Sequence, residues 1–324
     1  MHRLMTLTPE IIALLTLDIL FLLLGTVAFA VSLGMVWRWD ACATTALQYT
    51  LEKRSYLVSV IIKYLFIIKL PLFLFFIYTL DKLSDIITGA MCATGVVNAV
   101  DFGFYLTTLK LINLYGFGFW LLVHHADMKH ILMPYTRMKL WLFILLFIPL
   151  IAEISLEILF FSSLNISKIV SCCGTLFSAA SSSYTSLLFK VDALVWVGFF
   201  YFFAGLVLVA YRLKNTFLMI FANSFFLIFA IISLIVFFST YVYELPTHRC
   251  PFCLLQKEYY GVGYLLYTTL FIGTFSGMGG ALLQVISHEE QGVWFKRSLF
   301  FNGLYVGVVS LYPLMYYLKN GVWL

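Results

Sequence analysis

Long apolar stretches recur along this chain and constrain its fold more than any other feature. Eight of them lie at approximately 9–36, 56–80, 103–124, 139–161, 191–211, 216–242, 260–285 and 298–318. Each can cross about 30 Å of hydrocarbon as an α-helix. Hydrophobic residues make up 63% and charged residues 11% of the 324 residues, and the mean hydropathy is +1.00, which excludes a soluble domain of this size. The sequence therefore predicts an all-α fold, a polytopic integral membrane bundle of about eight transmembrane helices, forming a single domain over residues 1–324.

The distribution of Lys and Arg between the loops predicts an orientation. The loops after the first, third, fifth and seventh stretches carry ten of these residues, and the opposite side carries seven. Because cytoplasmic loops are enriched in Lys and Arg, both termini are expected outside the cytoplasm. The first stretch is too long for a cleaved signal peptide and is expected to remain as an anchor. We therefore expect an integral protein of a bacterial or archaeal cytoplasmic membrane.

The cysteines are segregated by this orientation. Cys42 is expected on the cytoplasmic side, and the other five are expected on the extracytoplasmic side: Cys92, Cys172, Cys173, Cys250 and Cys253. Membrane proteins without thiol chemistry scatter their cysteines through the apolar spans as small hydrophobic residues. None of the six lies deep in a predicted span here, so the pattern indicates a function for thiols.

A C-x-x-C motif, Cys250 to Cys253, lies in the loop between the sixth and seventh stretches. Pro251 fits the first position of a helix, which makes Cys250 the expected N-cap, facing the positive end of the helix dipole. His248 and Arg249 precede it and are expected to favour its thiolate form. Thiolates of depressed pKa are the nucleophiles of disulfide exchange, and C-x-x-C is their usual setting. The same two cysteines can also bind a soft metal ion, or form a static disulfide.

The remaining outer cysteines lie in two other loops. Cys172 and Cys173 are adjacent, in a segment of small and polar residues. A disulfide between adjacent residues is strained and therefore easily reduced, and the two sulfurs can alternatively bind a thiophilic metal. Cys92 is a single thiol within another segment of small residues. For Cys92 a redox role and an ordinary buried loop cysteine both stay open.

Several ionisable residues lie deep within the apolar stretches, where charges are costly and are normally paired or functional. We select Asp18, Lys69, Lys110, Glu153 and Glu157. Lys69 and Glu153 are at similar depth in their spans, which predicts an ion pair. Glu153 and Glu157 are spaced i, i+4 and share one helical face. Such a network can relay protons to a reduced quinone, line an ion path, or serve only to lock helix packing.

A group of histidines and one aspartate lies near the cytoplasmic ends of the third and seventh stretches. Histidines facing each other across a bundle can ligate haem b or a divalent metal. We favour the interpretation that these are interfacial side chains, and haem b is not expected. The residues concerned are His124, His125, Asp127, His130 and His288.

At the level of the site, the chain resembles the DsbB and vitamin K epoxide reductase type of membrane thiol oxidoreductase. Cys250 and Cys253 match the C-x-x-C of those proteins in spacing and placement, and Cys172 and Cys173 correspond to their second, loop-borne pair. The resemblance implies electron transfer from the thiols of a periplasmic or extracytoplasmic protein to a quinone. The chain differs in its eight predicted spans, where those families form a four-helix core, and in the adjacency of its loop pair.

Three functions are therefore compatible with the sequence. The first is a thiol–disulfide oxidoreductase that passes electrons from outer-face cysteines to a membrane acceptor such as quinone. The second is a protein that transports or delivers a soft metal of the copper or mercury type by thiolate transfer. The third is a structural or assembly subunit with static disulfides. The expected partners are the lipid bilayer and an extracytoplasmic thiol protein, and no nucleic-acid motif is present. The cysteines assigned to the first function are Cys92, Cys172, Cys173, Cys250 and Cys253, and the last four are also the metal ligands of the second.

Overall fold

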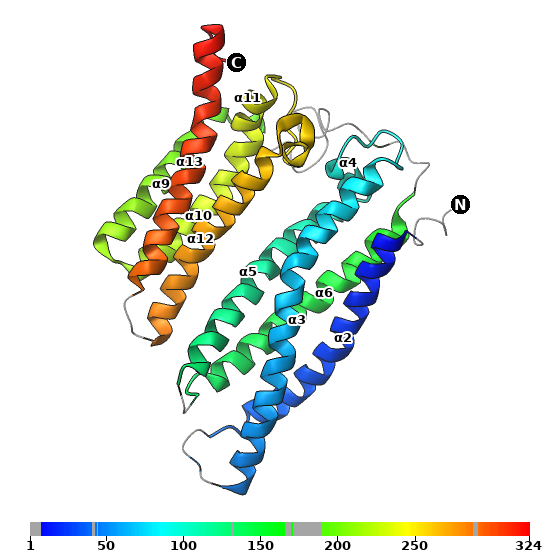
Figure 1. Ribbon diagram of the computed structural model, residues 1–324, viewed down its shortest axis with the longest axis vertical. Coiled ribbons are helices and arrows are strands. Elements are labelled where there is room, and N and C mark those ends of the chain that lie inside the picture. Colours follow the sequence, from blue (N-terminus) through cyan, green and yellow to red (C-terminus); the bar gives the residue numbers. More distant parts are fainter. Residues whose placement is uncertain are drawn as a thin grey trace. The chain divides into compact units, whose positions relative to one another are not determined.

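The chain is almost entirely helical in the computed structural model, which describes residues 8–40, 43, 45–130, 133–165, 170, 189–287 and 291–324. Eight helical segments are long and apolar enough to cross a membrane, and no strand occurs among the described residues. The predicted all-α, polytopic helical bundle is confirmed. The segments (Figure 1) are α2 (Pro9–Val36), α3 (Ala46–Ser84), α5 (Gly103–Met128), α6 (Thr136–Ser163), α9 (Ala193–Leu213), α10 (Thr216–Ser233) with its continuation to Tyr243, α12 (Val262–Ser287) and α13 (Gly292–Asn320).

Large apolar side chains are exposed along these helices. Examples are Leu23 of α2, Leu145 of α6 and Phe202 of α9, each more than 60% exposed. In water such surfaces would be unfavourable, whereas lipid tails are as apolar as leucine. The chain is therefore an integral membrane protein.

The second membrane helix is longer than its apolar stretch. Helix α3 begins at Ala46, about ten residues before the predicted start, because Thr45 accepts a hydrogen bond from the backbone N–H of Gln48 at 3.3 Å and caps the helix. Its 39 residues rise about 58 Å at 1.5 Å per residue. The helix is therefore longer than the hydrocarbon layer of about 30 Å.

The chain divides into two compact units. The first comprises Met1–Thr88 and Val96–Ile169, and the second comprises Gly89–Gly95 and Val170–Leu324. A short helix, α4 (Ala93–Asn98), lies where the chain passes from one to the other. The segment around Cys92 thus belongs with the C-terminal half of the chain. The expected single domain over 1–324 stays a prediction.

The first unit is a four-helix bundle. Each helix contacts two others, in the cyclic order α2, α3, α5, α6 and back to α2. Aromatic rings fill part of its core: Phe66 stacks on Phe117 with ring centroids 4.3 Å apart, and Trp120 lies edge-on to Phe66 at 5.4 Å. Helices α3 and α6 each contain an internal proline, Pro71 and Pro149.

The second unit is also a four-helix bundle, with contacts between α9 and α10, α10 and α12, α12 and α13, and α13 and α9. The helix that begins as α10 passes through a π-helical turn, η1 (Leu234–Phe238), before it ends as α11 (Ser239–Tyr243). The loop that follows contains two 3₁₀ turns, η2 (Cys253–Leu255) and η3 (Lys257–Tyr259), and leads to α12.

Close helix packing in the second unit centres on small and polar residues. Ser298 and Asn302 of α13 both donate to Oδ1 of Asn223 in α10, at 3.1 and 2.8 Å. Gly277 of α12 lies against this group, and a Cβ there would be 2.3 Å from Nδ2 of Asn223. Only a residue without a side chain allows the three helices to approach this closely.

Candidate functional site

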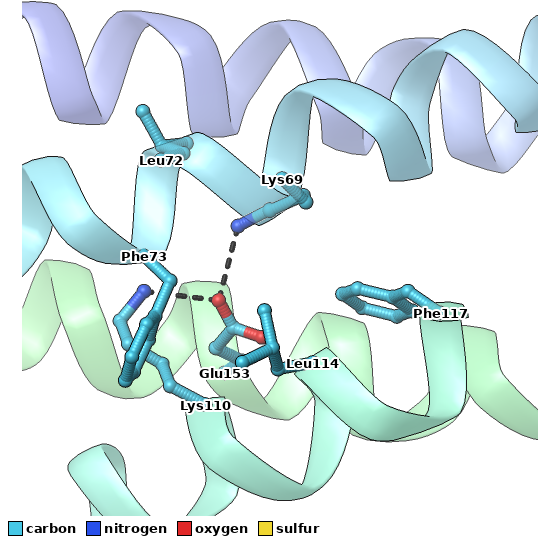
Figure 2. A pocket seen from close by; sticks show the side chains of 7 residues that line it. All are labelled: Lys69, Leu72, Phe73, Lys110, Leu114, Phe117 and Glu153. Carbon is cyan, nitrogen blue, oxygen red and sulfur yellow. Dashed lines mark hydrogen bonds and ion pairs between the residues drawn. The ribbon is translucent and has the colours of Figure 1, made fainter. Parts of the chain in front are cut away.

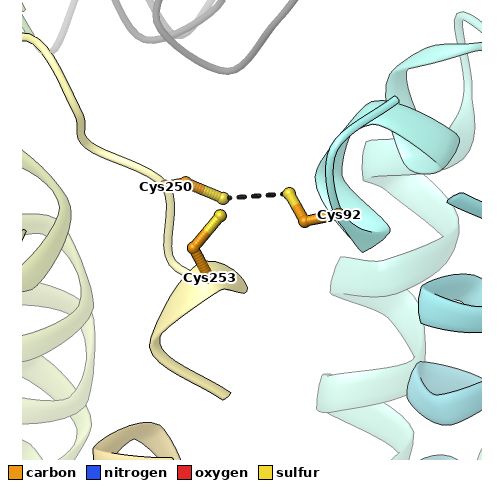
Figure 3. Close-up of side chains that lie close together, drawn as sticks. All are labelled: Cys92, Cys250 and Cys253. Carbon is orange, nitrogen blue, oxygen red and sulfur yellow. Dashed lines mark hydrogen bonds between the residues drawn. The ribbon is translucent and has the colours of Figure 1, made fainter. Parts of the chain in front are cut away.

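Three cysteines converge in the second unit. The Sγ atoms of Cys92, Cys250 and Cys253 all lie within 4.8 Å of one another (Figure 3). Cys92 Sγ lies 3.4 Å from Cys250 Sγ. Cys92 and Cys250 are fully buried, and Cys253 is 3% exposed. Two segments that are far apart in the sequence thus form one buried thiol cluster, which we define as these three residues.

The loop around the C-x-x-C does not have the predicted conformation. Pro251 lies in a turn, the 3₁₀ turn η2 begins at Cys253, and the membrane helix α12 begins only at Val262. Gln256 has an extended backbone and ends η2, and Tyr260 has a φ angle of +53° and ends η3, so no continuous helix joins Cys250 to α12. The expectation that Cys250 caps a helix is wrong. The dipole of α12 therefore does not explain an activated thiolate at Cys250.

Two tyrosines hold the backbone of the loop. The hydroxyl of Tyr243, the last residue of α11, donates to the carbonyl of Cys250, and the hydroxyl of Tyr267 in α12 donates to the carbonyl of Pro251 at 2.5 Å. Both carbonyls belong to residues that precede η2 (Cys253–Leu255). Hydrogen bonds from two helices of the same bundle therefore fix the position of Cys250.

The segment that carries Cys92 is fastened to the same loop. Thr94 Oγ1 lies 3.0 Å from Cys250 Sγ, and the side-chain amide of Gln256 donates to the carbonyl of Met91 at 3.1 Å. Sequence analysis identified neither Thr94 nor Gln256. The only signal was position, because Thr94 follows Cys92 by two residues and Gln256 follows Cys253 by three.

His248 and Arg249 lie beside the cluster, and burial works against a positive charge on each of them. The ring of His248 packs edge-on against Tyr243 with centroids 4.3 Å apart, and burial lowers the pKa of His248, opposed by the charge of Cys92. Its Nε2 is buried and has no hydrogen-bond partner among the described residues. The guanidinium of Arg249 lies 5.0 Å from the ring of Phe189, and burial lowers the pKa of Arg249. Burial thus disfavours the charged form of both side chains, and thiolate stabilisation by the pair stays a prediction.

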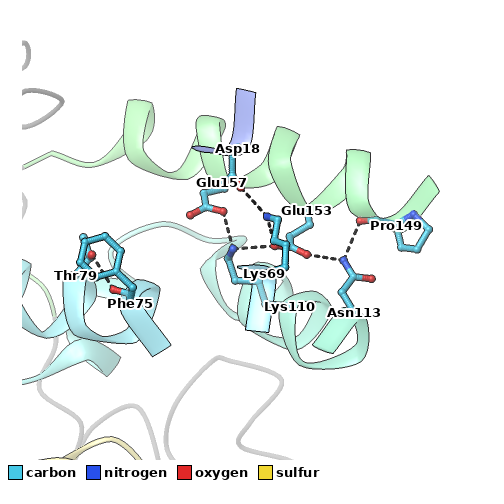
Figure 4. Close-up of polar contacts among 9 residues, drawn as sticks. All are labelled: Asp18, Lys69, Phe75, Thr79, Lys110, Asn113, Pro149, Glu153 and Glu157. Carbon is cyan, nitrogen blue, oxygen red and sulfur yellow. Dashed lines mark hydrogen bonds and ion pairs between the residues drawn. The ribbon is translucent and has the colours of Figure 1, made fainter. Parts of the chain in front are cut away.

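A second group of functional side chains lies in the first unit (Figure 4). Lys69 of α3 contacts Oδ1 of Asp18 in α2 at 2.6 Å and Oε1 of Glu153 in α6 at 3.1 Å. Lys110 of α5 contacts the same Glu153 oxygen at 2.9 Å and Oε2 of Glu157 at 2.6 Å. All five side chains are at most 5% exposed. The predicted Lys69–Glu153 ion pair is confirmed, and we define these five residues as the charge network.

An amide completes the network. Nδ2 of Asn113 in α5 donates to Oε2 of Glu153 at 2.6 Å and to the carbonyl of Pro149 at 3.1 Å. Sequence analysis missed Asn113, although it follows Lys110 by three residues and shares its helical face. A cavity of about 10 Å³ lies beside Lys69, Lys110 and Glu153 and is otherwise lined by apolar side chains (Figure 2). That volume suffices for about one water molecule.

The histidines near the end of α5 lie among ordinary packing contacts. The ring of His124 stacks on Trp120 with centroids 5.1 Å apart and an angle of 9°. Asp127 accepts hydrogen bonds from the Lys139 ammonium at 2.6 Å and the Thr136 hydroxyl at 2.9 Å, so it fastens α5 to α6. His288 lies outside the described residues. Within the described ranges, the one group of three or more converging metal-ligand side chains is the thiol cluster.

No family model matches this chain. The same holds for the curated proteins and the solved structures that were compared with it. Its function is therefore argued from the thiol cluster and the charge network.

The structure brings together most of the residues selected from the sequence. The five charged residues selected from the apolar stretches meet in one network, and three of the five cysteines that were predicted to be extracytoplasmic meet in one cluster. Cys172 and Cys173 lie outside the described residues, as does Cys42. The orientation of the chain in the membrane stays a prediction.

Proposed function

We propose that this chain is a membrane thiol–disulfide oxidoreductase whose redox centre is the thiol cluster. The observation that carries the proposal is the 3.4 Å separation of Cys92 Sγ and Cys250 Sγ, next to the C-x-x-C partner Cys253. Disulfide exchange requires a thiolate to reach a disulfide sulfur directly. Three sulfurs within 4.8 Å meet that requirement with little movement of the backbone.

The proposed exchange within the cluster is balanced. In the oxidised protein a disulfide joins Cys250 and Cys253. The Cys92 thiolate attacks Cys250 Sγ, a Cys92–Cys250 bond forms, the Cys250–Cys253 bond breaks, and Cys253 leaves as a thiolate that takes up a proton. No electrons are gained or lost in this step. The disulfide thereby moves from the C-x-x-C to the segment that carries Cys92.

Turnover requires an electron donor and an acceptor. The proposed donor is the dithiol of an extracytoplasmic protein, which becomes a disulfide and passes two electrons and two protons to the cluster, leaving the cluster with two thiols. The proposed acceptor is a quinone, which takes two electrons and two protons to become a hydroquinone while the cluster returns to a disulfide. Beside Arg249 lies an open cavity of about 340 Å³, a size that suits a ring-shaped ligand. Its other lining residues are the apolar Phe189, Val191, Ala193 and Val236 and the charged Lys190 and Asp192.

The architecture of the second unit also supports the proposal. It is a four-helix bundle in which the C-x-x-C precedes the third helix, α12. Membrane thiol oxidoreductases of the type that the site resembles have a four-helix core. The eight spans that seemed to separate this chain from them are divided between two units, and one unit alone holds the described cysteines of the cluster.

The test is a count of thiols in the purified protein in lipid nanodiscs. The reduced wild-type protein should lose two thiols per chain when a soluble quinone analogue is added, and one hydroquinone should form. The thiols are counted with a maleimide after denaturation, because the cluster is buried in the folded protein. Cys250→Ser should lose none, whereas Cys42→Ser, the matched control outside the cluster, should behave like the wild type. Unchanged thiol counts in the wild-type protein after quinone addition would refute quinone reduction by the cluster.

A second candidate function is binding and transfer of a soft metal ion. The observation that favours it is that all three sulfurs fall within 4.8 Å. Thiolates bound to one ion at about 2.3 Å stand about 4 Å apart, so the cluster needs little adjustment to bind a soft ion. Reduced protein should then bind one Cu(I) per chain, and serine at any of the three positions should weaken binding similarly. Oxidoreductase activity predicts instead that Cys250→Ser is far more damaging than Cys92→Ser or Cys253→Ser.

A further inference from the structure

The charge network has unequal numbers of acids and bases. It contains three carboxyl groups and two ammonium groups, so full ionisation gives −3 + 2 = −1. The four helices that surround it, α2, α3, α5 and α6, contribute no other charged side chain to these contacts. An uncompensated charge buried in a membrane protein is strongly unfavourable. One proton bound to the network would make it neutral.

The hydrogen bonds show which carboxyl groups can hold that proton. Both oxygens of Glu153 are occupied, because Oε1 accepts from Lys69 and Lys110 and Oε2 accepts from Asn113. Asp18 and Glu157 each use one oxygen, for Lys69 and Lys110 respectively. Glu153 is therefore stabilised as a carboxylate.

The other oxygens of Asp18 and Glu157 are different. Oδ2 of Asp18 and Oε1 of Glu157 are buried, and within the described part of the chain they have no hydrogen-bond donor. Both side chains are 0% exposed. A buried acceptor without a donor is unfavourable by about 1–3 kcal/mol. Two carboxylates can only accept hydrogen bonds, so a hydrogen bond between these two oxygens requires a proton on one of the two carboxyl groups.

Both lysines of the charge network are held in their charged form, so the excess negative charge has to be balanced elsewhere. Each is held by two carboxylate oxygens, and each also faces an aromatic ring. Lys69 Nζ lies 5.5 Å from the centroid of Phe21, and Lys110 Nζ lies 4.6 Å from that of Phe76. The negative face of an aromatic ring favours the charged form of a lysine.

We propose that Asp18 and Glu157 bind one exchangeable proton between Oδ2 and Oε1, which makes the first unit an intramembrane proton-binding site. The proton converts two buried acceptors into one hydrogen bond and cancels the excess charge. The small cavity beside Lys69, Lys110 and Glu153 lies next to the ion-pair partners of both carboxyl groups and has room for about one water molecule. This site is independent of the thiol cluster, and its test does not involve redox activity.

Infrared spectroscopy of the protein in lipid nanodiscs tests the proposal directly. The wild-type protein at pH 7 should show the C=O band of one buried carboxylic acid per chain. The band should shift in D₂O, because the bound proton exchanges. It should weaken as the pH rises, because the carboxylic acid then loses its proton. In one sample the side-chain carboxyl carbons of Asp are labelled with ¹³C, and in a second sample those of Glu. Each label should shift part of the band, and neither measurement needs a substitution.

Two amide variants give an independent result. Asp18→Asn and Glu157→Gln each replace one carboxyl group of the pair with a neutral amide, which can donate a hydrogen bond to the remaining carboxylate. Each variant should therefore fold, and each should lose the band. Glu244→Gln is the matched control, because Glu244 follows the end of α11 and its ion pair with Lys319 is exposed, and the band should remain.

Several outcomes would overturn the proposal. Absence of the band in the wild-type protein, or a band that responds to neither pH nor D₂O, excludes an exchangeable proton. A band that survives in both amide variants places the proton elsewhere. Thermal stabilisation by NaCl over KCl at equal ionic strength, lost in both variants, would assign the site to a sodium ion instead.

Discussion

The Sγ atoms of Cys92 and Cys250 lie 3.4 Å apart, although 158 positions separate the two residues in the sequence. The contact joins the loop after α3 to the loop after α11. No local pattern connects these loops, so the fold of the second unit creates the pairing. Both residues are fully buried, which limits the partners that their sulfurs can reach.

Removal of Cys253 should trap that pairing as a covalent bond. In Cys253→Ser, Cys250 has lost its C-x-x-C partner, and mild oxidation should therefore produce one Cys92–Cys250 disulfide per chain. Peptide mapping by mass spectrometry without reduction detects it. Cys92→Ser should give the Cys250–Cys253 disulfide instead. A Cys253→Ser protein that joins Cys250 mainly to Cys172 or Cys173 would contradict the arrangement of the cluster.

Loss of one lysine from the charge network should be strongly destabilising. Lys69→Met leaves Asp18 and Glu153 without a shared cation, and removing one partner of a buried ion pair typically lowers the free energy of unfolding by about 3–5 kcal/mol. Adding Asp18→Asn should recover part of the loss. Lys319→Met is the control, because its ion pair with Glu244 is exposed and worth at most about 1 kcal/mol. Equal unfolding transitions for the two lysine variants would contradict the buried network.

Alanine at two glycines of the second unit should have opposite effects. A Cβ at Gly277 would lie 2.3 Å from Asn223 Nδ2 and 2.6 Å from Ser298 Oγ, and overpacking of this kind costs about 1–3 kcal/mol. A Cβ at Gly303 of α13 meets no atom within 4 Å, so Gly303→Ala should be neutral or stabilise the helix by up to about 1 kcal/mol. Thermal unfolding of both variants in the same detergent makes the comparison. Tolerance of alanine at Gly277 would mean that the helices are less closely packed.

Acidification should weaken the loop next to the cluster. Burial lowers the pKa of His248 in the folded protein below its ordinary value of about 6.5, so the unfolded chain binds more protons between the two pKa values. The contribution of His248 to stability is therefore complete above about pH 6.5 and is lost as the pH falls towards its folded-state pKa. His248→Asn should reduce the dependence of the melting temperature on pH between about 7.5 and 5.5. An identical dependence in the variant would show that His248 is not buried as described.

The membrane helices could be predicted because each carries its own signal. A long apolar stretch specifies a transmembrane helix without reference to the rest of the chain. The predicted start at about 56 for α3 failed because polar helix formers extend the helix back to the cap at Thr45. Hydropathy reports the part of a helix that enters lipid, and capping residues decide where the helix begins.

The sites were only partly predictable. Charged residues within an apolar span are easily recognised in a sequence, because their burial is costly. Their matched depth was enough to pair Lys69 with Glu153. Asn113 is uncharged and gave no such signal, although it bonds to Glu153 as closely as a lysine would. The predicted conformation at Cys250 was wrong because a proline that fits a helix start also fits a turn, and the extended backbone of Gln256 ends the short 3₁₀ turn that follows Pro251.

The π-helical turn Leu234–Phe238 sets the angular register of the sixth membrane segment. A π-helical turn accommodates one extra residue, which rotates everything after it by about 100° relative to an uninterrupted α-helix. Tyr243 lies five residues beyond this turn and donates to the carbonyl of Cys250. Deleting a single apolar residue between 234 and 238 would keep the segment long enough to cross the membrane, yet it would turn the tyrosine hydroxyl away from the thiols. The position of Cys250 within the cluster thus depends on the number of residues in the part of this segment that crosses the bilayer.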